Sequence, residues 1–146
     1  MAEDLDRYKI KQLSIFSENR PGRLMDFSKA MGEESINILA FSIAEGAGYG
    51  VIRAFVSDPE KALRRLQEHG FVVRYTDVIA INMADKPGGL YELTKVLKDA
   101  GINIEYAYAY RNEPGAILVI RVEDIEKAIR TIKASGAHLL DASSFK

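Results

Sequence analysis

The stretch "ENRPGRL", residues 18–24, decides the fold because the chain repeats it as "ADKPGGL" at residues 84–90. In both copies a polar residue, Asn19 or Asp85, stands two positions before a Pro-Gly pair, and an amphipathic run follows. A small protein that builds the same polar corner twice is either duplicated or has a chemical use for that corner.

The repeat extends far beyond the corner. Residues 13–73 align with residues 79–139 without a gap, and many of the aligned positions are identical or keep their chemical class. A gapless match of this length indicates that one structural unit occurs twice. We therefore predict two domains, residues 1–75 and residues 76–146, with no flexible linker between them.

Each unit has the pattern strand, helix, strand, strand, helix, strand. Short alternating or β-branched runs indicate the strands, and helical spacing of apolar residues indicates the helices. Two helices and four strands from one unit predict an α+β fold: two tandem ferredoxin-like units, each with an antiparallel sheet and helices on one face. The predicted strands are residues 11–17, 35–45, 51–56 and 71–76, then 78–83, 101–110, 117–122 and 137–142.

Local signals place the helices. Pro21 and Pro87 are expected near the first turn of a helix, where a missing N–H costs nothing. The predicted inward stripes of these helices are Leu24, Phe27 and Met31, and Leu90, Leu93 and Leu97. The second helix of the first unit is predicted to open with a capping box from Ser57 to Glu60 and to end at Gly70; its counterpart opens at Asp124 and ends at Gly136.

The third strand of each unit is apolar on both faces. Ile52, Ala54 and Val56 can face the helices, yet Val51 and Phe55 on the other face are apolar too. A sheet with one face in water alternates more cleanly than this. We therefore expect the second face to be covered by the sister unit or by another chain, and we expect a homodimer.

The corners could bind an anion. A Pro-Gly pair at a helix start leaves backbone N–H groups free, and these groups and the helix dipole favour a carboxylate or a phosphate. Asn19 or Asp85 could hold an ammonium group, and Asn37 or Asn103, just past the helix, could bring an amide back to the corner. This combination suits a free amino acid. The alternative is that Pro and Gly only shape a turn, with Asn or Asp as the helix cap.

The runs "NRPGRLMDFSKAMGEESINI" and "DKPGGLYELTKVLKDAGINI" resemble the signature of ACT domains. ACT domains are ferredoxin-like sensors that bind amino acids between side-by-side domains, so the resemblance implies a tandem ACT protein without a catalytic domain. It also implies ligand contacts from each loop and the strand that follows. The residues implied are Asn19, Arg20, Gly22, Arg23, Leu24, Asn37 and Ile38 in the first unit, and Asp85, Lys86, Gly88, Gly89, Leu90, Asn103 and Ile104 in the second.

The first loop is similar to the serine-sensing ACT domain of phosphoglycerate dehydrogenase, and to the loop of the acetolactate synthase regulatory subunit. It departs from the dehydrogenase at Ser17, where that sensor has a histidine. This difference argues against serine itself as the ligand.

The composition of the chain argues against several classes of function. The chain has 146 residues, no Cys, two His and a net charge of −1. We therefore expect no metal site, no cofactor and no catalytic triad, and nothing in the sequence indicates an enzyme. The absence of Cys fits the cytoplasm. No apolar run is long enough to span a membrane.

Three hypotheses remain from the sequence. The first is a non-catalytic regulatory protein that binds a free amino acid. The second is a regulatory subunit that acts by docking on a separate enzyme of amino-acid metabolism. The third is an RNA-binding module, since RNA-recognition motifs share the topology; the net charge and a first strand of unit two without aromatic residues argue against nucleic acid.

Overall fold

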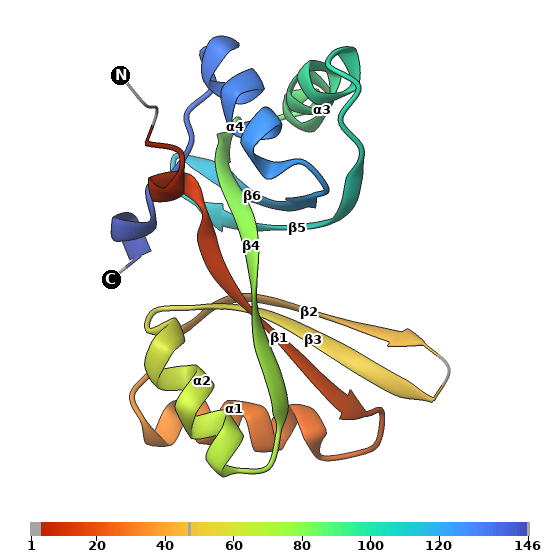
Figure 1. Ribbon diagram of the computed structural model, residues 1–146, viewed down its shortest axis with the longest axis vertical. Coiled ribbons are helices and arrows are strands. Elements are labelled where there is room, and N and C mark those ends of the chain that lie inside the picture. The colour runs from red at the N-terminus through yellow and green to blue at the C-terminus, as the bar shows by residue number, and fades with distance from the viewer. Residues whose placement is uncertain (1–3, 47, 146) are drawn as a thin grey trace. The chain divides into compact units, whose positions relative to one another are not determined.

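The computed structural model describes residues 4–46 and 48–145, which form two compact units. The N-terminal unit spans Lys11–Thr76, and the C-terminal unit combines the described part of Met1–Ile10 with Asp77–Ser144. Each unit has an antiparallel sheet with two helices on one face, as Figure 1 shows. The predicted α+β architecture of two ferredoxin-like units is confirmed.

In the N-terminal unit the strand order is β2-β3-β1 followed by the first part of β4, so β2 lies at a sheet edge. Residue Leu13 of β1 pairs with Ala54 of β3, and Ile43 of β2 pairs with Ile52 of β3. The elements are β1 (Ile10–Glu18), α1 (Arg23–Glu33), β2 (Ile38–Gly46), β3 (Tyr49–Val56), α2 (Pro59–Glu68) and β4 (Val72–Met83).

The core of this unit forms between the helices and the sheet. Phe27, Met31 and Leu66 from the helices pack against the strands and are completely buried. The third strand contributes the residues expected to face the helices, namely Ile52, Ala54 and Val56.

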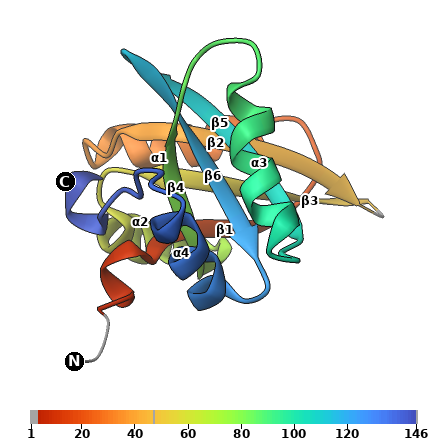
Figure 2. The ribbon, with the colours of Figure 1, turned by 90° about the horizontal axis from the view of Figure 1, so that it is seen from above.

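The C-terminal unit repeats this plan. Its strand order is β4-β6-β5, with β5 at the edge. Figure 1 shows α3 and α4 on one side of β5 and β6, the side from which Figure 2 is seen. Its elements are the second part of β4, α3 (Gly89–Asp99), β5 (Ile104–Asn112), β6 (Gly115–Val122) and α4 (Ile125–Ala134), with short 3-10 helices at Asp6–Tyr8 and Ala142–Phe145.

The first residues of the chain complete this second core. Leu5 is buried in it and Tyr8 packs on its border. Two ion pairs fasten the same segment, Arg7 to Asp141 at 2.8 Å and Lys9 to Glu126 at 3.2 Å. The first residues of the chain therefore belong to the C-terminal unit, which is otherwise built from residues 77–144.

The fourth strands differ from the prediction. In the N-terminal unit the predicted strand runs without interruption into the first strand of the next repeat, which makes the single long strand β4. In the C-terminal unit residues 137–142 form only an isolated bridge between Leu139 and Ile81. The bridge is held by backbone bonds on either side of it, from Asn82 N–H to the His138 carbonyl and from Leu140 N–H to the Ala80 carbonyl, each at 2.9 Å.

The helix boundaries correct several expectations. The N-cap of α2 is Asp58, which accepts a bond from the Lys61 N–H at 3.2 Å, so the predicted capping box at Ser57 is wrong by one residue. Asp124 caps α4 as predicted. Gly70 follows α2 with a φ of +85°, the left-handed ending that the sequence predicted.

The third strand of each unit also carries buried apolar side chains on the sheet face opposite the helices. Phe55 in β3 is 1% exposed, and Ile117 and Val119 in β6 are completely buried. The continuous apolar character of the third strands therefore reflects burial on both faces.

Candidate functional site: the corner before the first helix

The Pro-Gly pair of the N-terminal unit turns the chain from β1 into α1. Helix α1 begins at Arg23, and its N-cap is Gly22 with a φ of +93°. Pro21 therefore precedes the cap instead of lying in the first turn. The cap makes no side-chain hydrogen bond, so the alternative in which Asn19 caps this helix is wrong.

This cap leaves donors at the corner. The first N–H groups of a helix have no acceptor within the helix. The Asp26 N–H already donates to the Gly22 carbonyl at 2.9 Å, and the Arg23 N–H donates weakly to the Arg20 carbonyl at 3.4 Å. The N–H groups of Leu24 and Met25 remain without an acceptor in the helix, at the positive end of its dipole.

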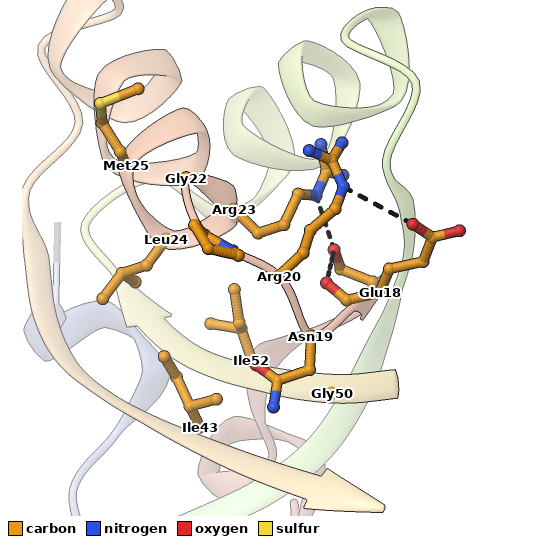
Figure 3. Close-up of a pocket in the computed structure, with 12 residues that line it drawn as sticks. Glu18, Asn19, Arg20, Gly22, Arg23, Leu24, Met25, Ile43, Gly50 and Ile52 are labelled. Carbon is orange, nitrogen blue, oxygen red and sulfur yellow. Dashed lines mark hydrogen bonds and ion pairs between the residues drawn. The ribbon is translucent and has the colours of Figure 1, made fainter. Parts of the chain in front are cut away.

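A cavity of about 270 Å³ opens at this corner. It brings together five of the seven residues predicted for the first unit: Asn19, Arg20, Gly22, Arg23 and Leu24. Figure 3 shows it between the loop, the start of α1 and the hairpin of β2 and β3. The other lining residues are Ser17, Glu18, Pro21, Met25, Ile43, Gly50 and Ile52.

One wall of the cavity is apolar. Leu24 and Met25 reach it from α1, while Ile43 and its cross-strand partner Ile52 reach it from the sheet. Leu24 is 37% exposed and Met25 is 64% exposed, although Leu24 was predicted to lie in the core with Phe27. Ile43 is also 46% exposed. The first turn of α1 therefore presents apolar surface to the cavity instead of to the core.

The opposite wall is polar and held by its own bonds. The Arg23 Nε donates to the Ser17 hydroxyl at 2.6 Å, and the guanidinium lies 4.2 Å from the centre of the Phe71 ring. The Ser17 hydroxyl in turn donates to the Glu18 carbonyl at 3.1 Å. The exposed Arg20 pairs with the Glu18 carboxylate at 3.5 Å, and Figure 3 shows these contacts on the side of the loop away from Ile43.

The Asn19 side chain lies between the two walls. In Figure 3 its amide points toward Ile43 and Ile52. It lies beside Gly50, since a Cβ built at Gly50 would stand 3.7 Å from the Asn19 Cβ, an ordinary van der Waals contact. Asn19 is therefore the polar side chain that faces the apolar part of the cavity.

Asn37 and Ile38 lie elsewhere in the N-terminal unit. They open β2 beyond the far end of α1, and a helix of 11 residues separates them from the corner by roughly 16 Å. The Asn37 N–H donates to the Ser57 hydroxyl, and the Ser57 N–H donates to the Asn37 carbonyl, each at 2.9 Å. The structure does not bring the Asn37 amide back to the corner of its own unit.

The corner of the C-terminal unit has a tighter loop. Gly88 is the N-cap with a φ of +88°, and Gly89, which aligns with Arg23, is buried. A Cβ built at Gly89 would overlap the carbonyl oxygen of Ala84. The Asp85 carboxylate pairs with Arg111 of β5 at 3.2 Å, whereas Lys86 and Leu90 are exposed.

Asn103 and Ile104 lie away from this second loop. They line a shallow cavity of about 470 Å³ at the far end of α3. Asn103 also borders a neighbouring cavity of about 380 Å³ with Glu105, Glu123 and Lys127. As in the first unit, the loop residues and the asparagine that opens the next strand stand at opposite ends of one helix.

Seven cavity residues were not predicted, namely Ser17, Glu18, Pro21, Met25, Ile43, Gly50 and Ile52. Ile43 and Ile52 could have been found from hairpin register, which sets them opposite each other on the helix side of the sheet. In residues 4–46 and 48–145, no group of three His, Asp or Glu side chains could hold a metal ion. None of the described helices is long and apolar enough to cross a membrane.

The family model for an ACT domain pair matches residues 8–142. This chain belongs to the ACT domain pair family. The ACT resemblance seen in the sequence is thereby confirmed over nearly its whole length.

Solved structures support the same fold. Protein BT0572 from Bacteroides thetaiotaomicron is 40% identical over 94% of this chain and 96% of its own, with a TM-score of 0.89. The ligand-free regulatory subunit of aspartate kinase from Thermus thermophilus has a TM-score of 0.62 at 18% identity, over 92% of this chain and 97% of its own. No curated protein matches the sequence.

Proposed function

We propose that this ACT domain pair is a non-catalytic, cytoplasmic regulatory protein that binds a free amino acid at the corner before α1. The observation that carries the proposal is the cavity itself, where free helix N–H groups, the Asn19 amide and an apolar wall meet. Family membership supports a regulatory role.

The two ends of the cavity suit the two charges of an amino acid. The α-carboxylate accepts bonds from the N–H groups of Leu24 and Met25, where the helix dipole favours negative charge. The Asn19 side-chain oxygen accepts a bond from the α-ammonium. An amino acid bound this way needs both charged groups, so amino-acid amides and N-acetyl derivatives should fail to bind.

A second copy of the chain completes the site in this proposal. Strand β2 lies at the edge of the sheet of its unit, and Phe41 on it is 48% exposed. Edge strands pair readily with another chain. Antiparallel pairing of two β2 strands about a two-fold axis would bring Asn37 of one copy toward the β2 end, and hence the corner, of the other. The homodimer therefore supplies the amide that the corner lacks.

Ligand binding is tested by thermal denaturation and calorimetry with the twenty amino acids. A ligand this small should bind with a Kd of roughly 10 μM to 1 mM. At about 100 Kd it should stabilise the fold by about 2.7 kcal/mol. Asn19→Ala should weaken binding by about 1–3 kcal/mol, and Asn112→Ala, at the end of β5, is the matched control. If no amino acid raises the melting temperature, the sensor function is refuted.

The homodimer has a separate test. Light scattering should give about twice the 16.3 kDa of one chain at micromolar concentration. Phe41→Glu, on the β2 edge, should yield the monomer. A wild-type protein that scatters as a monomer contradicts the composite site.

A second candidate function is docking on a separate enzyme of amino-acid metabolism. The observation that favours it is apolar surface on α3, where Leu90 is 52% exposed and Tyr91 is 67% exposed. The Thermus thermophilus protein of similar fold is the regulatory subunit of an enzyme, aspartate kinase. Failure of every amino acid to bind would make this the leading function.

A further inference from the structure

We propose that the cavity before α1 selects an amino acid with a branched apolar side chain, and that it discriminates against serine and threonine. The inference rests on the proposed amino-acid binding and adds the class of the ligand. Three observations carry it: the lining of the cavity, the state of its polar groups, and the contrast with the second corner.

The lining offers apolar contact on the side where a ligand side chain would lie. With the α-carboxylate at the start of α1 and the ammonium at Asn19, the remaining space is bounded by Leu24, Ile43 and Ile52. Leu24 and Ile43 are partly exposed, so covering them with a ligand methyl group removes apolar surface from water on both sides.

The polar side chains of the opposite wall are engaged with one another and lie on the side of the loop away from Ile43. Ser17 already accepts from Arg23 and donates to the Glu18 carbonyl. Arg23 is also paired with Asp26 at 3.4 Å and stacked on Phe71. A serine or threonine hydroxyl would enter an apolar space without a partner, which costs free energy.

The size of the cavity agrees with a single amino acid. Its volume of about 270 Å³ lies just below the range of roughly 300–1,000 Å³ that holds drug-sized ligands. A free amino acid with a four-carbon side chain can therefore fit in this space.

The corner before α3 differs from the corner before α1 at two positions. Ala109 stands where the first repeat has Ile43, and it pairs with Leu118 as Ile43 pairs with Ile52. Gly89 and the Ala84 carbonyl approach each other where Arg23 stands in the first repeat. The selection for an apolar side chain is therefore a property of the first corner.

The sharpest test compares L-valine with L-threonine, which have the same shape and differ in a methyl against a hydroxyl group. Calorimetry of the wild-type protein should show valine binding about 10- to 100-fold more tightly than threonine. L-leucine and L-isoleucine should bind in the same range as valine, and L-serine more weakly than all three.

The matched variants are Ile43→Ala, which gives the first corner the residue of the second, and Ala109→Ile as the reverse change. Ile43→Ala should weaken valine and leucine binding by about 15- to 60-fold, since it removes about two to three buried methylene equivalents from the wall. Ala109→Ile should leave the affinity unchanged. Light scattering of both variants checks that the assembly is retained.

The outcomes separate this inference from the proposed function. Tighter binding of serine or threonine than of valine overturns the ligand class and leaves the sensor function intact. Equal weakening by Ile43→Ala and Ala109→Ile overturns the assignment to the first corner. Absence of binding by every amino acid refutes the proposed function, and this inference with it.

Discussion

Gly89→Ala tests whether the second corner is built as tightly as the structure shows. Gly89 begins α3, and its Cβ would overlap the carbonyl oxygen of Ala84. That oxygen belongs to the backbone, so the loop before Pro87 has to move as a whole. Overpacking of this kind costs about 1–3 kcal/mol, against which the better helix propensity of alanine returns at most about 1 kcal/mol.

Gly32→Ala is the matched control. Gly32 lies in the last turn of α1, and a Cβ there would meet nothing within 4 Å. The same substitution should therefore stabilise the protein, by about 0.5–1 kcal/mol. Urea unfolding followed by circular dichroism should place the midpoint of Gly89→Ala below that of the wild type and the midpoint of Gly32→Ala above it.

A Gly89→Ala protein at least as stable as the wild type would refute the tight loop. It would mean that the second corner can open at little cost, and the contrast between the two corners would lose its basis. A lowered midpoint for Gly32→Ala would contradict the open surroundings of Gly32, because both the free space and the helix propensity favour alanine there.

Three further predictions concern stability. Gly22→Ala should lose about 1–2 kcal/mol, because a Cβ at a φ of +93° is strained, and urea unfolding measures it. Asp58→Ala and Asp124→Ala each remove an N-cap, so each should cost about 1 kcal/mol in the same assay; no loss at either would contradict the cap. The backbone N–H of Ser143 is the main cause that lowers the pKa of Asp141 in the folded state. Because the pKa is lowered on folding, the Asp141 carboxylate stabilises the fold at neutral pH, and this stabilisation is lost as the pH falls below about 4. The melting temperatures of Asp141→Asn and the wild type should therefore converge there.

Much of the fold could be predicted because local and long-range signals agreed. The repeat predicted two ferredoxin-like units, and Gly70 and Asp124 marked helix boundaries that the structure confirms. The capping error at Ser57 arose because two adjacent residues can both cap, and Ser57 is taken by the Asn37 backbone. The final strand of the second unit was overestimated because β propensity does not reveal how many backbone pairs a neighbour offers.

The candidate site was predictable only in part. The Pro-Gly loop identified its polar side, since the chemistry of a helix start is local. Leu24 fits the helical stripe by spacing, yet it lies in the first turn, outside the core, and is partly exposed. The position of Asn37 depends on the length of α1, which carries it away from the loop. Neither fact follows from periodicity alone.

The contact between Arg7 and Asp141 has a consequence for the order of folding. The two residues are 134 positions apart, and closing a flexible loop of that length costs about 4 kcal/mol in chain entropy. Residues 11–76 form a unit from contiguous chain and bear no such cost.

During synthesis the N-terminal unit leaves the ribosome whole, and its folding replaces much of that flexible loop with fixed structure. The segment around Leu5 and Arg7 must wait for the end of the chain before it can dock. We expect the N-terminal unit to be a folding intermediate, and the first residues of the chain to be among the last to become ordered.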